Sequence, residues 1–241
     1  MPAGTKKTGN GRFVAVYEIL RRAYGPQRWW PVTPAGEMRP RYTGGPETEP
    51  QRFEVAAGAI LTQNTAWSNA ARAIESLNAG RFLNPEALFA LDEKSLAGII
   101  RSAGYYNQKA KRLKILAAFF LTGEKVTRQS LLALNGVGPE TADSIMLYAL
   151  GEPCFVVDAY TRRIFGRLGL VNPDAPYEEV RRIFEWNLPR RIRVYREYHA
   201  LIVEHGKRVC KKVPLCEICL LRNLCNVYLM SSKGRAAKRR S

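Results

Sequence analysis

The sequence predicts an all-α fold of two helical lobes, and three observations lead to this prediction. Apolar residues recur at helical spacing over most of the chain, and no segment alternates apolar and polar residues as a half-buried strand does. Proline, asparagine and glycine also stand at the ends of the helical segments. With 241 residues, 46% of them hydrophobic, the chain is long enough to bury a core.

The predicted helices follow one another closely from the first to the last. One is expected to begin at Asn84-Pro85, because proline is favoured in a first helical turn, and another after Asp158. The others are expected over residues 12–24, 53–62, 67–77, 95–103, 109–121, 130–134, 141–150, 177–186 and 196–204. Residues 25–51 are rich in proline, glycine and polar residues and are predicted to form a loop.

These elements suggest a division of the chain. Residues 1–51 are expected to form an N-terminal helix and an aromatic loop, and residues 52–230 a helical core of two lobes. The N-terminal segment is expected to pack with the second of these lobes. Residues 231–241 are predicted to be a disordered basic tail.

The charge balance indicates a polyanionic partner. The chain holds 38 Lys and Arg against 21 Asp and Glu, a net charge of +17. Basic side chains placed on phosphates release counterions, so such an excess is typical of nucleic-acid binding. An acidic membrane surface is the alternative, but no apolar run approaches the roughly 18 residues of a membrane span and no signal-peptide pattern opens the chain. We expect an intracellular, cytoplasmic protein that does not associate with a membrane.

A glycine-containing turn over residues 134–142 is the most informative segment. Gly136 and Gly138 allow a tight turn and a close backbone approach, and Pro139 then begins a helix. Backbone N–H groups at such a helix start form an anion site. A simple helix–turn–helix corner is the alternative, but the turn lies between two helical segments of a strongly basic chain.

The turn is also where a family resemblance becomes visible. Leu-x-Gly-Val-Gly-x-x-Thr-Ala, followed by Val157-Asp158, resembles the helix-hairpin-helix and Gly/Pro-Asp signature of the endonuclease III superfamily of DNA glycosylases, and the similarity runs from about Phe53 to Cys225. It implies a base-excision repair enzyme with two helical lobes and DNA across the cleft between them. The implied partner is double-stranded DNA containing a damaged base, bound by a nucleoid-associated monomer. The residues implied to contact DNA through the hairpin are Gly136, Val137, Gly138 and Thr141.

By this resemblance Asp158 is the catalytic carboxylate. Cleavage of an N-glycosidic bond builds positive charge on the sugar, which a fixed carboxylate stabilises while it orients the attacking water. Asp158 also precedes a predicted helix, so its structural role is that of an N-cap, and the two roles can coexist.

Glu140 marks a departure from the bifunctional members of the superfamily. Those enzymes carry a lysine at this position, which forms a Schiff base with the sugar. A glutamate cannot do so, and we predict base removal by water without AP lyase activity. Of the other amines, Lys109, Lys111 and Lys207 are expected on a solvated face or against phosphate.

The tryptophans suggest the base pocket and the substrate. Trp-Trp-Pro at residues 29–31, followed by Leu-Thr-Gln-Asn-Thr-x-Trp, is similar to the 3-methyladenine DNA glycosylase III group. That resemblance implies a pocket for an alkylated purine, whose positive charge is attracted by aromatic faces. This sequence differs from that group because it retains four clustered cysteines. Core packing of the tryptophans is the alternative. The implied pocket residues are Trp29, Trp30, Pro31 and Trp67.

Gln63 occupies the family position that fills the gap left by a flipped nucleotide. Its amide could pair with the orphaned base, and the alternative is an ordinary glutamine on a helix surface.

Four cysteines crowd into residues 210–225, and the resemblance implies that they hold a [4Fe–4S] cluster. The ligands would be Cys210, Cys216, Cys219 and Cys225. A zinc site is the alternative, although only one Cys-x-x-Cys pair is present. We expect this loop to dock DNA rather than to take part in catalysis.

Three functions remain open from the sequence. The first is a monofunctional alkylpurine DNA glycosylase. The second is a monofunctional glycosylase for uracil, mismatched thymine or a deaminated purine. The third is a DNA-binding protein without catalysis, in which Asp158 serves only as a helix cap.

Overall fold

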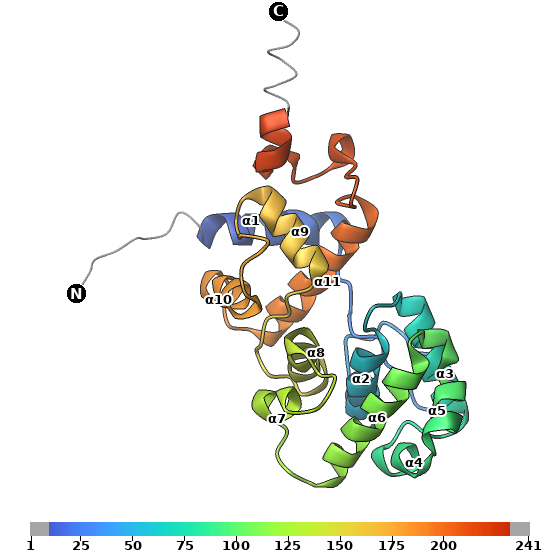
Figure 1. The fold of residues 1–241 in the computed structure, drawn as a ribbon. Helices are drawn as coiled ribbons and strands as arrows, with labels where there is room; N and C mark the ends of the chain where they lie inside the picture. Colours follow the sequence, from blue (N-terminus) through green and yellow to red (C-terminus); the bar gives the residue numbers. More distant parts are fainter. Residues whose placement is uncertain (1–9, 232–241) are drawn as a thin grey trace, which may run out of the picture. The chain divides into compact units, whose positions relative to one another are not determined.

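The computed structural model describes residues 10–231 of the chain, and this part is built mainly from α-helices, with a long connection over residues 25–48 (Figure 1). The prediction of an all-α fold is confirmed, since the described residues contain no strand beyond an isolated antiparallel bridge between Val32 and Arg41. No helix in residues 10–231 is long and apolar enough to cross a membrane. The predicted basic tail, apart from Ser231, lies outside the described residues.

The helices divide between two compact units, which we call unit 1 and unit 2. Unit 1 combines the chain up to Gln27 with the chain from Phe155 onward, and unit 2 is Arg28–Cys154. Unit 1 contains α1 (Asn10–Tyr24), α9 (Ala159–Leu168), α10 (Tyr177–Asn187) and α11 (Ile192–Arg208). Unit 2 contains α2 (Glu49–Leu61), α3 (Trp67–Ala79), α4 (Pro85–Ala90), α5 (Glu93–Ile99), α6 (Tyr106–Leu121), α7 (Arg128–Leu132) and α8 (Pro139–Ser144).

Unit 2 is organised around α2. Every residue of this helix from Phe53 to Leu61 is buried, and α2 packs on α3, α6 and α8. Helices α4 and α5 lie against α6, which runs beside α2 (Figure 1). A helix surrounded in this way is apolar on all sides, which explains the small and apolar composition of residues 53–61.

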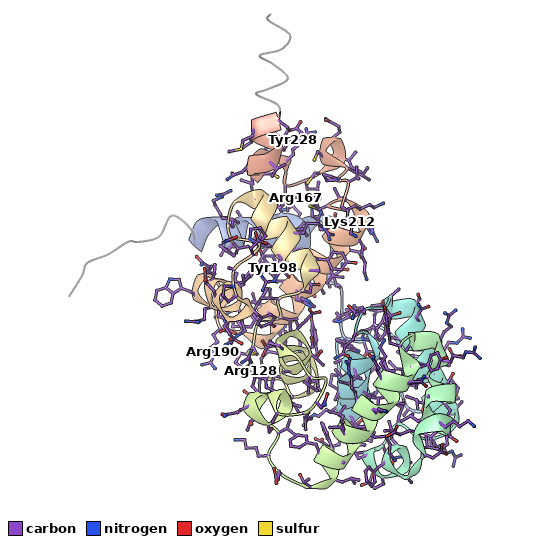
Figure 2. The ribbon with its side chains drawn as sticks, in the orientation of Figure 1. Arg128, Arg167, Arg190, Tyr198, Lys212 and Tyr228 are labelled. Atoms are coloured by element: carbon purple, nitrogen blue, oxygen red, sulfur yellow. The ribbon has the colours of Figure 1, made fainter. Side chains whose placement is uncertain are left out.

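Unit 1 is held together by an aromatic core. Phe155 stacks on Phe184 with 4.2 Å between ring centroids, and Phe13 stacks on Phe165 at 5.3 Å. Tyr198, labelled in Figure 2, contacts the rings of Phe155 and Phe165, and its hydroxyl donates a 2.7 Å hydrogen bond to the carbonyl of Phe13. This core joins the N-terminal helix α1 to helices that lie about 150 residues later in the chain.

The observed helix ends follow the capping chemistry of the sequence. Asn84 caps α4 and Asp158 caps α9, each through its side chain, as expected. Helix α2 begins four residues earlier than expected, because Thr48 and Gln51 form a capping box. The expected helix over 141–150 is an α-helix only to Ser144 and continues as a wider π-type turn, Ile145–Ala149.

Candidate active site

The helix-hairpin-helix motif is formed by α7, the turn after it and α8. Thr127 caps α7, and Pro139 occupies the first turn of α8. Gly136 has φ +86°, a backbone conformation that favours glycine, and a Cβ placed on it would lie 2.3 Å from Nε of Arg112. Gly138 is extended and meets nothing within 4 Å. The first glycine is therefore required by the turn, while the second leaves open space beside the backbone.

The hairpin offers backbone donors rather than side chains. Among the described residues, the amides of Gly136 and Gly138 donate no hydrogen bond, whereas the Val137 amide donates to the carbonyl of Leu134 at 3.1 Å. The Val137 side chain is buried, and so is Thr141. The Gly136 and Gly138 amides are thus available to an anion, whereas the Val137 amide is not.

Gln63 is bound to this hairpin. Its Nε2 donates to the Gly136 carbonyl and to the Thr141 hydroxyl, both at 3.0 Å. Its Oε1 accepts a 2.5 Å hydrogen bond from Arg112. Arg112, which also packs against Gly136, has no counterpart in the sequence-based prediction. These bonds join the end of α2, helix α6 and the hairpin through a single amide.

The three tryptophans predicted to form the base pocket come together in unit 2. Trp67 lies edge-on to both Trp29 and Trp30, with centroids 5.0 and 5.7 Å apart, and Trp30 also contacts Tyr148 at 5.4 Å. Trp30 and Pro31 are buried, whereas Trp29 and Trp67 are half-buried. The indole N–H of Trp30 is buried and has no acceptor among residues 10–231. Gly58 lies under this indole, with a Cβ position 3.3 Å from its Nε1 and Cζ2 atoms.

A buried carboxyl anchors the segment that carries Trp29 and Trp30. Glu54 of α2 accepts hydrogen bonds from both the amide and the hydroxyl of Thr33, each at 2.9 Å. Burial raises the pKa of Glu54 to about 7, although the two bonds from Thr33 act to lower it. The sequence-based prediction did not include this pair.

Asp158 is the N-cap of α9 in unit 1. Its Oδ1 accepts from the Thr161 amide at 2.7 Å and from the Thr161 hydroxyl at 2.8 Å. Its Oδ2 lies 3.6 Å from Nε2 of His199, which belongs to α11. Both side chains are about nine-tenths buried. The predicted capping role is confirmed, and His199 is a neighbour that sequence reasoning missed.

The structure places Glu140 and Lys109 in different environments. Glu140 is exposed in the first turn of α8. The expectation that Lys109 lies on a surface is wrong: it is 1% exposed, and its ammonium donates 2.8 Å hydrogen bonds to the carbonyls of Leu61 and Ala103. Burial, together with Arg112, lowers the pKa of Lys109 to about 8.

The cysteine loop is held by arginines of α9. Arg167 donates to the carbonyls of Lys211 and Lys212 at 2.7 and 2.8 Å (Figure 2) and to the Cys210 sulfur at 3.3 Å. Arg163 donates to the Cys210 carbonyl at 2.8 Å. The basic residues of the loop and of the end of α11 are exposed, namely Lys207, Arg208, Lys211, Lys212 and Arg222.

The four thiols of this loop neighbour one another. Burial raises the pKa of the Cys219 thiol, and the other three thiols raise it further. Cys219 also lies 3.5 Å from Nε2 of the fully buried His205, whose Nδ1 is 2.9 Å from the Tyr24 hydroxyl. Within residues 10–231, no group of three or more His, Cys, Asp or Glu side chains is arranged to hold a metal ion. The chemistry of four thiols fits an iron–sulfur cluster.

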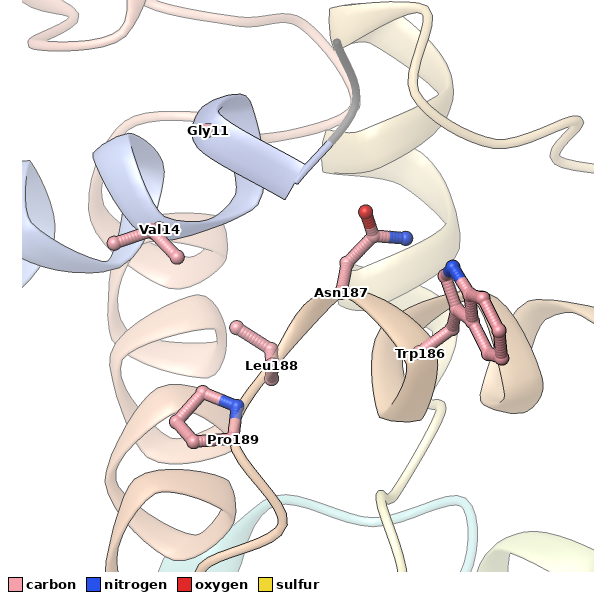
Figure 3. Close-up of a pocket in the computed structure, with 6 residues that line it drawn as sticks. All are labelled: Gly11, Val14, Trp186, Asn187, Leu188 and Pro189. Carbon is pink, nitrogen blue, oxygen red and sulfur yellow. The ribbon is translucent and has the colours of Figure 1, made fainter. Parts of the chain in front are cut away.

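A separate surface pocket of about 560 Å³ opens in unit 1 (Figure 3). Its lining contains no acid, base or nucleophile, which makes it unsuitable for cleavage of a glycosidic bond. The lining residues are Gly11, Val14, Trp186, Asn187, Leu188 and Pro189.

Comparison with known proteins decides the family. The model of the HhH-GPD superfamily of base excision DNA repair proteins matches residues 57–190, more than half of the chain. The chain belongs to this superfamily. The matched HhH-GPD region includes the hairpin and Asp158 and ends before the cysteine loop.

Individual HhH-GPD proteins resemble the chain over most of its length. A Methanocaldococcus jannaschii protein, named as a candidate DNA repair glycosylase, is 46% identical over 87% of this chain and 94% of its own. Endonuclease III of Thermotoga maritima is 32% identical over 80% of this chain and 90% of its own. The resemblance to endonuclease III is therefore confirmed.

Two solved structures share the HhH-GPD fold. The H. pylori 3-methyladenine DNA glycosylase bound to 1,N6-ethenoadenine aligns with a TM-score of 0.66 and 26% identity, over 83% of this chain and 97% of that one. An endonuclease III in a non-covalent complex with DNA aligns with a TM-score of 0.76 and 21% identity, over 93% and 98% of the two chains.

Proposed function

We propose that this DNA glycosylase is monofunctional. It flips a damaged base out of double-stranded DNA, hydrolyses the N-glycosidic bond and leaves the strand intact. The proposal rests on two residues taken together. Asp158 supplies a buried, hydrogen-bonded carboxylate, and position 140 holds a glutamate where strand cleavage would need a nucleophilic lysine. Lys109 is buried and its ammonium donates to two carbonyls, so in this proposal it does not supply the missing amine.

The reaction requires a fixed negative charge near the sugar. As the bond to the base breaks, its electron pair leaves with the base and the sugar becomes positively charged. Water then forms the new bond to C1′ and loses a proton to solvent. Because Thr161 holds Oδ1 of Asp158 through two hydrogen bonds, the carboxylate keeps one orientation and can supply this fixed charge.

The preferred substrate in this proposal is an alkylated purine such as 3-methyladenine. A positively charged base is a good leaving group and is attracted by aromatic faces. The half-buried rings of Trp29 and Trp67 are suited to stack on it, and the buried N–H of Trp30 still needs an acceptor. The similarity to the H. pylori 3-methyladenine DNA glycosylase supports this substrate class.

Binding to DNA is proposed to use the hairpin and the basic surface of a single protein molecule on intracellular, nucleoid DNA. The Gly136 and Gly138 amides would donate to a phosphate, and the open space beside Gly138 leaves room for that phosphate. Gln63 would fill the gap left by the flipped nucleotide after its amide leaves Gly136 and Thr141.

We also propose that Cys210, Cys216, Cys219 and Cys225 bind a [4Fe–4S] cluster. Its contribution is to fix the fold of the loop that presents exposed basic residues to phosphates, rather than to take part in the reaction. Endonuclease III relatives at 32% and 28% identity support this assignment.

A panel of duplexes with one lesion each tests the proposal. We expect release of 3-methyladenine or a related alkylpurine in single-turnover assays, and no release by Asp158→Asn, which should still bind DNA. Release of uracil, mismatched thymine or a deaminated purine instead would show that the substrate is not an alkylated purine. Equal release by Asp158→Asn would contradict the role of the carboxylate.

The absence of lyase chemistry is tested with borohydride on the same substrates. Because Glu140 offers no amine, we expect no trapped complex, and strand breaks only after alkali or heat. A cross-linked band that grows with turnover would contradict the monofunctional mechanism. Glu140→Lys is a useful companion variant, since the hairpin that would position the new amine is already formed.

A further inference from the structure

The environment of Asp158 raises a problem that helix capping alone does not solve. The carboxylate is buried, and burial by itself would raise its pKa and favour the neutral form. A neutral carboxyl group cannot stabilise a positively charged sugar. The neighbouring His199 ring and the Thr161 amide and hydroxyl outweigh this effect and hold the pKa of Asp158 below its ordinary value.

The two oxygens of Asp158 have different neighbours. Oδ1 accepts both bonds from Thr161, and the bond from the Thr161 amide is that of an ordinary N-cap. Oδ2 has the His199 ring at 3.6 Å. His199 belongs to α11, which packs on α9, and it adds nothing to the capping of α9. Its placement is thus not explained by the fold of the α9 N-terminus.

We propose that His199 is a positioning residue of the excision reaction, which orients Oδ2 of Asp158 and keeps the carboxylate charged. This inference rests on the proposed hydrolytic function. Its Nε2 atom lies 3.6 Å from Oδ2, the oxygen that Thr161 does not hold, so the ring is placed to restrict rotation of the carboxylate. Asp158 is then ready to face the sugar without rearrangement, which is how an electrostatic catalyst gains its effect.

Other titratable groups near Asp158 do not provide this charge control. The Tyr177 hydroxyl of α10 accepts from the Val157 amide at 3.3 Å, and Tyr195, one turn before His199 on α11, packs on Phe155. Tyrosines are neutral at the pH of the reaction. The His199 ring and Thr161 are the groups that lower the pKa of Asp158.

The consequence for pH dependence has a definite sign. Excision requires charged Asp158, so activity falls as pH drops through the pKa of this carboxyl. Since His199 lowers that pKa, the acid limb of the rate profile lies at a lower pH than it would without the ring. Removing His199 should therefore move the acid limb upward.

The test is the pH profile of single-turnover base release by His199→Phe and His199→Gln. We expect His199→Phe, which has no donor, to shift the acid limb upward by about 1–3 pH units, the range typical of losing a charged neighbour. His199→Gln keeps an N–H donor without a titrating ring and should shift it by less. Tyr195→Phe is the matched control on the same helix and should keep the wild-type limb.

Two outcomes separate this inference from the function on which it rests. If Asp158→Asn abolishes release but the acid limbs of both His199 variants coincide with wild type, His199 has no such role. If Asp158→Asn releases the base normally, the proposed function itself is wrong. Should His199→Phe fail to fold, the profile of His199→Gln alone decides, since an unshifted limb overturns the inference.

Discussion

At the scale of single residues, several side chains in this protein take their properties from burial. Glu54, Lys109 and Asp158 are all charged residue types with less than 10% exposure. Each is matched to partners of opposite polarity: hydroxyl and amide donors for the two carboxyls, carbonyls for the amine. Buried charges survive only with such partners, and removing one partner costs more than the bond itself is worth.

Trp67 provides a residue-scale test of the base pocket. Trp67→Ala should slow turnover of the preferred lesion more than it weakens binding to undamaged duplex, because its ring acts on the base only after flipping. Stacking is worth about 1–3 kcal/mol per base, so a decrease of roughly tenfold or more is expected. Lesion turnover and duplex affinity are compared in the same preparation.

Trp186 is the matched control for this substitution. It is 86% exposed in unit 1, and Trp186→Ala should leave turnover unchanged. Equal losses of turnover and of duplex binding in Trp67→Ala would instead mean that Trp67 serves to pack the core.

Glu54 predicts a pH-dependent stability. Its pKa in the folded protein, about 7, lies above that of an unfolded glutamate, so its penalty is absent at acid pH and grows as pH rises to 7. Glu54→Gln should therefore raise the free energy of unfolding at pH 8, by on the order of 2 kcal/mol, and have little effect near pH 4. Denaturant unfolding at the two pH values measures the difference, and a pH-independent effect would show that ionisation of Glu54 is not the cause.

At the scale of elements, the hairpin glycines differ in what they require. Gly136→Ala places a Cβ 2.3 Å from Arg112 in a positive-φ conformation, so it should lower stability by about 1–3 kcal/mol and disturb Gln63. Gly138→Ala meets nothing within 4 Å and should fold normally. Its added methyl group would still obstruct a phosphate, so we expect weaker DNA binding in both variants. Thermal unfolding separates them, and equal stability losses would contradict the assignment.

The elements also show how far the sequence predicts the molecule. Helix starts marked by Asn84 and Asp158 were predictable, because a cap is encoded within four residues. The neighbour of Asp158 was not, since His199 lies 41 residues away and reaches it only through the packing of α11 on α9. Lys109 was placed on a surface for the same reason, as its two carbonyl partners come from separate segments. A single sequence predicts local features such as helix caps, but it does not predict which distant residues contact each other in the fold.

At the scale of the whole molecule, the cysteine loop closes unit 1. Arg12 of α1 donates to the Leu224 carbonyl at 2.9 Å, while Arg163 and Arg167 of α9 bind the other end of the loop. The loop thus connects the first helix of the chain to α9 and α11. A cluster bound here would stabilise contacts well beyond its four ligands.

Metal analysis tests this assignment. The purified protein should be yellow-brown and contain about four irons per chain. Cys219→Ser should lose iron and lower the thermal unfolding temperature. Cys154→Ser keeps a donor to Asp143 and should retain the iron content and the unfolding temperature of the wild type. Stoichiometric zinc without iron would reverse the assignment in favour of a zinc site.

The division of the chain into units has a consequence for synthesis on the ribosome. Unit 2 is an uninterrupted segment, Arg28–Cys154, so all the helices that pack within it are available as soon as that segment has emerged. Helix α1 emerges before unit 2, but its core partners come much later, and Tyr198 lies 185 residues after Phe13. An exposed apolar face of α1 must therefore wait, through the production of all of unit 2, before it is covered. Nascent chains stalled before α9 should accordingly recruit chaperones to α1, although α1 is made before unit 2.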